Sequence, residues 1–138
     1  MKKIALFYIA TLFCTACGGY EHPTVPYASV DFTISVGDPN HYKLNHDGGY
    51  EYLTGGVRGI IVYRLNNYTF KAYDRACPYD WEEPDSWLWV DPSGLMVCDS
   101  CCGSLFNIID GTVVSGPARF PLKYYRATFD GMLLRIHN

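Results

Sequence analysis

The sequence predicts an all-β protein, because of its composition and its apolar pattern. Aromatic residues make up 16% of the 138 residues, led by twelve tyrosines, and Gly and Pro recur at short intervals. This composition is typical of many short strands joined by turns. No window shows the apolar period of an amphipathic helix, so no element type competes with strands.

Individual strands follow from alternating or β-rich segments between turn signals. Apolar alternation over residues 30–36 predicts the first strand, and the Gly- and Asn-rich residues 37–56 are expected to form a connection. Asn66-Asn67 and Asp130-Gly131 each predict a tight hairpin, because these residue types tolerate the positive φ of such turns. Further strands are expected at residues 57–65, 69–73, 87–90, 95–97, 105–108, 112–114, 122–129 and 132–136.

The N-terminus has the organisation of a signal peptide followed by a lipid attachment site. Lys2 and Lys3 precede an apolar run over residues 4–13 that is too short to span a bilayer. Small residues then lead to Cys17. We expect residues 1–16 to be removed and Cys17 to be acylated, which would hold the exported chain on a membrane, on the periplasmic side or at the cell surface. The alternative is secretion without a lipid.

Behind this anchor, the sequence has room for one domain. Residues 17–28 hold two Gly and two Pro without periodicity and are the expected lipid-attached tether, which leaves residues 29–138 as the β domain. The net charge of −3 is spread without basic runs, so we expect no nucleic-acid partner and membrane contact through the lipid alone. Nothing resembles a hydrolytic triad or a phosphate-binding loop. We therefore expect no catalytic residue, and an oxidoreductase or electron-transfer role if the protein is active.

Four further cysteines fall in two segments of the domain. Cys77-Pro78-Tyr79 and residues 98–103 form two knuckles that could hold one metal centre, either a zinc ion or an iron–sulfur cluster. Adjacent cysteines such as Cys101 and Cys102 rarely both reach one ion, and an oxidising compartment favours cystines over free thiolates. We therefore favour disulfides over a metal at this stage.

The motifs around these cysteines resemble a Rieske [2Fe-2S] domain in order and spacing. They are residues 72–78, 95–98, 103–106, 110–111, 116–118 and 121–122. In that family a Cys-Pro-His loop and a Cys-Pro-x-His-Gly-Ser loop hold the cluster, and a Gly-Pro-Ala loop covers it. The resemblance runs from about Val57 to the C-terminus. It implies a Rieske-like antiparallel β-sandwich or barrel of three small sheets, with a cluster-binding type of subdomain made of two loops.

The chain departs from the family at both histidine ligands. The first position falls on Tyr79, and the second falls on Cys102 or Cys101, depending on where the register is anchored. The four histidines of the chain lie outside both loops and are expected on the surface; they are His22, His41, His46 and His137. Exported Rieske proteins generally cross the membrane folded, with a twin-arginine signal that this chain lacks. The resemblance therefore implies a Rieske-like fold that has lost its cluster.

This comparison also implies a disulfide in place of the cluster. Two thiolates on one tetrahedral metal have their sulfurs roughly 3.7 Å apart, and a small loop shift would close this to the ~2.05 Å of a disulfide. We expect Cys77 to pair with Cys98, with Cys77–Cys102 as the main rival and Cys101 unassigned. No metal is favoured. If a [2Fe-2S] cluster is present, its ligands would be Cys77, Cys98, Cys101 and Cys102.

A candidate recognition rim lies on the insert between the two knuckles. It consists of Trp81, Trp87 and Trp89, with acidic residues between them. The alternative is that Trp87 and Trp89 pack inward. The favoured function is a binding or structural module of the cell envelope without a cofactor, whose partner is an envelope protein or ligand. The alternatives are a [2Fe-2S] electron carrier with cysteine-substituted ligands and a thiol-disulfide redox protein that uses Cys98 and Cys101.

Overall fold

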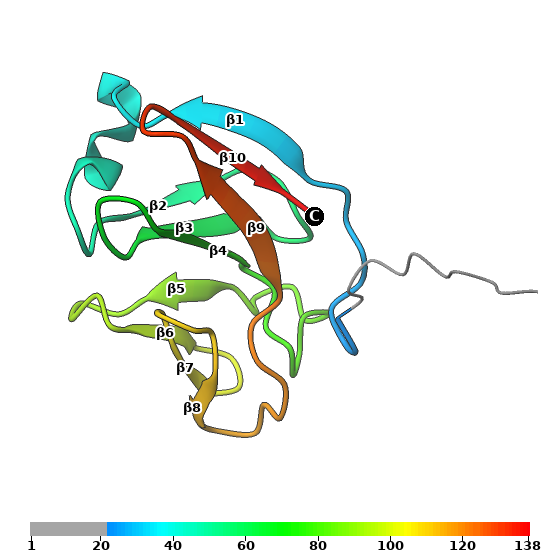
Figure 1. Ribbon diagram of the computed structural model, residues 1–138. Helices are drawn as coiled ribbons and strands as arrows, with labels where there is room; N and C mark the ends of the chain where they lie inside the picture. Colours follow the sequence, from blue (N-terminus) through cyan, green and yellow to red (C-terminus); the bar gives the residue numbers. More distant parts are fainter. Residues whose placement is uncertain (1–21) are drawn as a thin grey trace, which may run out of the picture.

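A six-stranded antiparallel sheet forms the larger part of the structure, a computed structural model that describes residues 22–138 (Figure 1). The predicted signal peptide, Cys17 and the start of the predicted tether lie outside the described residues. The all-β fold class is confirmed, and no helix among residues 22–138 is long and apolar enough to cross a membrane. In spatial order the strands are β1 (Asp31–Ser35), β10 (Leu133–His137), β9 (Tyr124–Phe129), β4 (Phe70–Asp74), β3 (Ile60–Arg64) and β2 (Tyr50–Leu53).

A second, four-stranded antiparallel sheet is inserted in the sequence between β4 and β9. It consists of β5 (Leu88–Val90), β6 (Met96–Asp99), β7 (Leu105–Asn107) and β8 (Val113–Ser115) in that order. Figure 1 shows β2, β3 and β4 between this small sheet and the β1–β10 pair. The insert carries all of residues 98–103 and receives the loop that follows β4, so both cysteine loops lie at this end of the molecule.

The two central strands of the large sheet pair over a short length. Strands β4 and β9 are joined by only two residue pairs, Ala72 with Tyr125 and Tyr73 with Tyr124, whereas β3 and β4 share five. The large sheet therefore consists of two three-stranded halves, β1-β10-β9 and β4-β3-β2. Together with the small sheet they form three groups of strands, as expected from the sequence.

Strand β3 separates two apolar cores and has both faces buried. Ile60 and Val62 pack into the core that the large sheet encloses, and Ile61 and Tyr63 pack against the small sheet. This explains why β3 is a continuous apolar run without alternation. The core on the small-sheet side includes Cys77, so the first cysteine loop is anchored by hydrophobic packing.

The connection predicted for residues 37–56 contains two elements that its composition did not predict. A 3-10 helix, η1 (Pro39–Asn45), begins after Asp38, whose side chain accepts a hydrogen bond from the Asn40 amide. Strand β2 follows and pairs with β3. Gly and Asn mark the turns on either side of these short elements, so their composition resembles that of one long loop.

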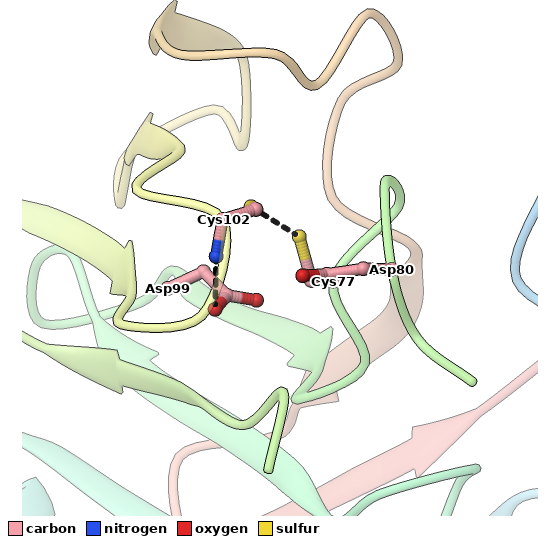
Figure 2. A group of neighbouring side chains, drawn as sticks. All are labelled: Cys77, Asp80, Asp99 and Cys102. Carbon is pink, nitrogen blue, oxygen red and sulfur yellow. Dashed lines mark hydrogen bonds between the residues drawn. The ribbon is translucent and has the colours of Figure 1, made fainter. Parts of the chain in front are cut away.

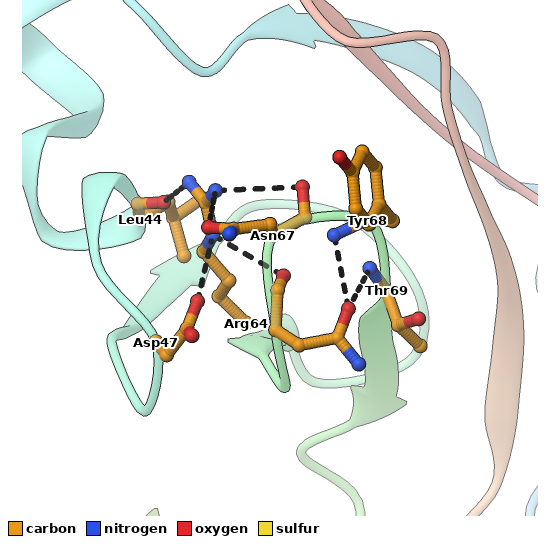
Figure 3. Close-up of polar contacts among 7 residues, drawn as sticks. Leu44, Asp47, Arg64, Asn67, Tyr68 and Thr69 are labelled. Carbon is orange, nitrogen blue, oxygen red and sulfur yellow. Dashed lines mark hydrogen bonds and ion pairs between the residues drawn. The ribbon is translucent and has the colours of Figure 1, made fainter.

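Arg64 and the Asn66 side chain organise the neighbouring hairpin (Figure 3). The Arg64 guanidinium donates to the Leu44 carbonyl at 2.8 Å and lies 3.5 Å from an Asp47 carboxylate oxygen. The predicted hairpin forms, but no residue other than Gly has a positive φ in the described part of the chain. Asn66 instead accepts hydrogen bonds from the amides of Tyr68 and Thr69 with its side chain.

The described part of the predicted tether packs on the domain. Val25 is fully buried, and His22, which was expected on the surface, is 7% exposed. The His22 Nε2 donates to the Pro121 carbonyl at 2.8 Å, since that oxygen can only accept. Its Nδ1 accepts from the Val25 amide at 3.1 Å. Because Nδ1 must be free of a proton to accept, this arrangement holds His22 neutral.

The buried His22 predicts a pH-dependent stability. The pKa of His22 lies below its ordinary value of 6.5, chiefly because of burial, and the charge of Lys123 lowers it further. The hydrogen bond to Pro121 and the charge of Asp74 act in the opposite direction but do not outweigh burial. As the pH falls below 6.5, the unfolded chain binds the proton first, so the free energy of unfolding decreases until the pH reaches the lower pKa of the folded state. The difference between wild type and His22→Gln should therefore shrink as the pH falls from about 8 to about 5, measured by urea unfolding.

The exposed His46 provides the matched control. His46→Gln removes an imidazole from the surface and is unfolded in parallel at each pH. A His22→Gln protein with the same pH profile as wild type would contradict the neutral, buried state of His22.

Asp74 is the polar centre of the fold. It is fully buried at the end of β4, and its Oδ2 accepts from the Val57 amide at 2.7 Å and from the Tyr125 hydroxyl at 2.6 Å. Its Oδ1 accepts from the amides of Arg58 and Ala76 at 3.1 and 2.9 Å. One carboxylate therefore joins the loop before β3, the start of the first cysteine loop and strand β9.

No side chain fits at position 56 beside the Asp74 carboxylate. Gly56 has a φ of +64°, and a Cβ at that position would lie 2.4 Å from the Asp74 Oδ2. A side chain there would clash with the carboxylate as well as strain the backbone. The loop between β2 and β3 therefore has glycine at positions 55 and 56. The strand predicted from Val57 starts only after this loop, at Ile60.

Replacing Asp74 should destabilise the protein severely. In Asp74→Asn one carboxylate oxygen becomes an amide NH₂ that faces two hydrogen-bond donors, so we expect the free energy of unfolding to fall by about 4 kcal/mol. Tyr125→Phe removes only one hydrogen bond to the carboxylate and should lower the free energy of unfolding by about 2 kcal/mol. Chemical denaturation measures both values. Asp31→Asn removes the exposed pair with Arg135 and is the control with little expected effect. An Asp74→Asn protein as stable as Asp31→Asn would contradict this role.

Candidate functional site

Two loops bring four metal-ligating side chains together at one end of the molecule (Figure 2). Cys77 and Asp80 follow β4, and Asp99 and Cys102 lie at the end of β6 and beyond it. The ligand atoms of these four residues all lie within 4.8 Å of one another, and the two sulfurs are 3.6 Å apart. The two segments have mirrored spacing, Cys-x-x-Asp in the first and Asp-x-x-Cys in the second.

The second loop is shaped by the Asp99 side chain. Its Oδ1 accepts from the amides of Cys101 and Cys102 at 2.6 and 3.3 Å, and the Gly103 amide donates to the Asp99 carbonyl. These bonds turn the chain tightly after β6, as Asp side chains commonly do in turns. The turn places the Cys102 sulfur opposite that of Cys77. The Cys102 thiol also donates to the Ser104 hydroxyl at 3.1 Å.

Ser86 connects the two loops. Its Oγ lies 2.6 Å from an Asp80 oxygen and 2.7 Å from an Asp99 oxygen. Ser86 is fully buried, and Asp99 is only 2% exposed. Both carboxylates are therefore held at short range around one hydroxyl.

Arg58 fixes the segment that runs between Asp80 and Ser86. Its Nε donates to the Trp81 carbonyl at 3.0 Å, and its two Nη atoms donate to the carbonyls of Glu83 and Pro84 at 2.8 and 3.1 Å. A guanidinium that satisfies three carbonyls orders this loop without secondary structure. The Arg58 amide is itself bound by Asp74, so the polar centre of the fold also positions the site.

The surroundings keep the Cys77 thiol protonated and Asp80 ionised. Burial raises the pKa of Cys77 far above its ordinary value, and the neighbouring Asp99 and Asp80 raise it further. Burial also acts to raise the pKa of Asp80, but hydrogen bonds from Ser86, Cys77 and Cys101 outweigh it and leave the pKa of Asp80 below its usual range. The site therefore combines a buried, protonated thiol with an ionised carboxylate.

The predicted Cys77–Cys98 disulfide is wrong, because all four cysteines of the described residues are free thiols. Cys98 lies within β6 between Val97 and Asp99, whose side chains face the core and the site. Strand alternation turns Cys98 to the opposite face, beside its cross-strand neighbour Trp89. The sulfur nearest to Cys77 belongs to Cys102, the rival partner, at a distance too long for a disulfide.

The four cysteines named as cluster ligands do not converge either. Cys98 faces away, Cys101 is exposed, and Tyr79, at the first histidine position, is 59% exposed. The donors that do converge are two sulfurs and two carboxylate oxygens. Since the irons of a [2Fe-2S] cluster take thiolates or imidazoles, this donor set does not fit the cluster.

The tryptophans of the candidate rim lie on the outer side of the insert. Trp87 and Trp89 are 43% and 39% exposed, while Leu88 between them is buried, so inward packing of the two rings is wrong. The guanidinium groups of Arg58 and Arg75 lie over the Trp87 ring at 5.4 and 5.2 Å. Trp81 is partly buried and is held through its backbone carbonyl.

Sequence reasoning missed Asp80, Asp99 and Ser86. The mirrored Cys-x-x-Asp and Asp-x-x-Cys spacing could have identified the two carboxylates as site residues. Nothing local indicates Ser86, because it reaches the site only through the fold of the insert.

Two comparisons with known proteins found no match. No protein-family model matches the chain, and no curated protein is significantly similar to it. The resemblance to the Rieske family therefore rests on the sequence motifs, and the function must be argued from the site.

Proposed function

We propose that this chain is an exported lipoprotein whose Rieske-like domain has lost its iron–sulfur cluster and serves as a binding or structural module of the cell envelope. One observation carries the proposal. The two loops in which a Rieske domain would hold its cluster present two sulfurs and two carboxylate oxygens to their common centre, and no imidazole. The signal-like N-terminus and Cys17 supply the envelope location.

The face that β6 presents to the site supports the loss of the cluster. Cys98 has the sequence position of a Rieske ligand, but Asp99 is the residue of β6 that faces the site. Asp99 also holds the turn through its bonds to Cys101 and Cys102. A loop stabilised by its own carboxylate keeps its shape without a cofactor, which a structural or binding role requires.

Exposed aromatic side chains support a binding role. Tyr79 lies on the first loop, and Trp87 and Trp89 lie on the outer side of the adjoining insert. Aromatic residues of this kind often anchor protein partners, because they bury a large apolar area with few rotatable bonds. The proposed partner is a protein or ligand of the cell envelope.

The thiol-disulfide alternative has no such support. Reactive Cys-x-x-Cys pairs have their first thiol at a helix N-terminus, which lowers its pKa. Here Cys98 lies within a strand, and the next element is the strand β7. Burial also raises the pKa of Cys98, as does the charge of Asp91.

The absence of the cluster is tested by chemical analysis. The full chain, produced in a host that assembles Rieske clusters, should contain no acid-labile sulfide and show no visible absorption of a [2Fe-2S] centre. A genuine Rieske protein made in the same host is the positive control. About two irons and two sulfides per chain would refute the proposal.

The envelope anchor is tested by fatty-acid labelling of the full chain. Wild type should incorporate labelled palmitate and sediment with membranes, and Cys17→Ala should lose both properties because the acylated thiol is gone. Cys14→Ala is the matched control, since it changes a cysteine three residues away and should keep both. Equal labelling of the Cys17→Ala and Cys14→Ala proteins would contradict acylation at Cys17.

A further inference from the structure

We propose that Cys77, Asp80, Asp99 and Cys102 bind one divalent cation of the zinc class. This goes beyond the proposed function, because a module without an iron–sulfur cluster has no need of any metal. It also differs from the ligand set expected from the sequence, which consisted of cysteines alone.

The geometry of the donors fits a single tetrahedral ion. Thiolates at about 2.3 Å from zinc lie roughly 3.7 Å apart, and the sulfurs of Cys77 and Cys102 are separated by 3.6 Å. All four ligand atoms lie within 4.8 Å of one another, so the most distant pair has to approach by roughly 1 Å to reach the separation of ligands on one zinc ion. Each loop supplies one sulfur and one oxygen, so a bound ion would join the two loops (Figure 2).

Two carboxyl groups crowd around one hydroxyl, a second feature that a bound cation would explain. The Ser86 hydroxyl has one proton and can donate it to one carboxylate only, yet Asp80 and Asp99 both lie within 2.7 Å of its oxygen. The second short contact is satisfied if one carboxyl keeps a proton and donates it to the Ser86 oxygen, and a cation bound between the carboxylates would replace that proton. None of the ion pairs formed within residues 22–138 includes Asp80 or Asp99.

The surroundings orient three of the four ligands, Asp80, Asp99 and Cys102. Ser86 holds one oxygen of each carboxylate, and the amides of Cys101 and Cys102 hold the other oxygen of Asp99. The Ser104 hydroxyl contacts the Cys102 sulfur and accepts from the Ala118 amide. Hydrogen bonds of this type fix the direction of metal ligands and raise affinity.

The site also offers an entry path. Cys77 and Asp99 are buried, whereas Asp80 and Cys102 are partly exposed on the solvent side. A cation can therefore reach the exposed pair first and then the buried pair.

The donor set selects the class of ion. Two thiolates exclude Mg²⁺ and Ca²⁺, which prefer oxygen, and zinc accepts both sulfur and carboxylate ligands. Binding forms two metal–sulfur and two metal–oxygen bonds. The thiol protons of Cys77 and Cys102, and any proton shared by the carboxyls, pass to solvent without a change in oxidation state.

Cobalt titration tests the site, because Co²⁺ replaces Zn²⁺ and reports its ligands by absorption. The reduced, chelator-treated full chain in detergent should bind one Co²⁺ with tetrahedral d–d bands and a thiolate charge-transfer band, and Zn²⁺ should displace it. Cys102→Ser should weaken binding more than about tenfold and reduce the charge-transfer band by about half. Asp80→Asn, a partly exposed position, should weaken binding and keep the full charge-transfer band.

Cys98→Ser is the matched control and should bind Co²⁺ like wild type. Circular dichroism of each variant confirms that it is folded. Failure of the reduced wild-type chain to bind stoichiometric Co²⁺ or Zn²⁺, or equal binding by the Cys102→Ser and Cys98→Ser proteins, overturns the proposal. A complete Cys77–Cys102 cystine in the chain isolated from membranes, found by non-reducing mass spectrometry, also overturns it.

Sulfide analysis of the same sample separates this inference from the proposed function. Acid-labile sulfide at cluster stoichiometry refutes the loss of the cluster. A sample free of both sulfide and zinc affinity refutes the metal site alone.

Discussion

The buried carboxylate of Asp74 is the interaction on which the rest of the structure depends. It lies where β4 ends, where the two halves of the large sheet share only two residue pairs, and it bonds to Tyr125 on β9 across that narrow junction. A buried carboxylate is costly unless its lone pairs are satisfied, and here four donors satisfy them. Because three of the donors are backbone amides of loops, Asp74 fastens these loops to the end of β4.

The same carboxylate controls the site at a distance. By binding the Arg58 amide it fixes the residue whose guanidinium holds the carbonyls of the segment after Asp80. By binding the Ala76 amide it fixes the chain just before Cys77. The first loop is thus positioned from both ends by contacts with the fold, while the second loop is shaped locally by Asp99. A site built in this way keeps its donors in place without depending on a cofactor.

The identity of the site follows from strand alternation in β6. One residue along a strand decides which face a side chain occupies, so Asp99 faces the Cys77 loop and Cys98 does not. The pattern of cysteines in the sequence suggests an all-sulfur centre or a disulfide. The structure instead brings together a mixed set of sulfur and oxygen donors around Ser86. This difference is the reason why a single zinc-class ion is proposed at the site, where the sequence favoured a disulfide and no metal.

The sequence by itself determined the all-β class, most strands, the two hairpins and the location of the cysteines in two loops, because these depend on local patterns of apolar residues and turn formers. It did not reveal η1 and β2, which are short and flanked by Gly and Asn, or the packing of His22 and Val25, which depends on Pro121 far along the chain. Only the tertiary structure decided which cysteine faces Cys77 and that Asp80, Asp99 and Ser86 share its site. The physical reason is that side chains from separate loops meet through the packing of two sheets, and the spacing of the cysteines does not show which face of β6 Cys98 occupies.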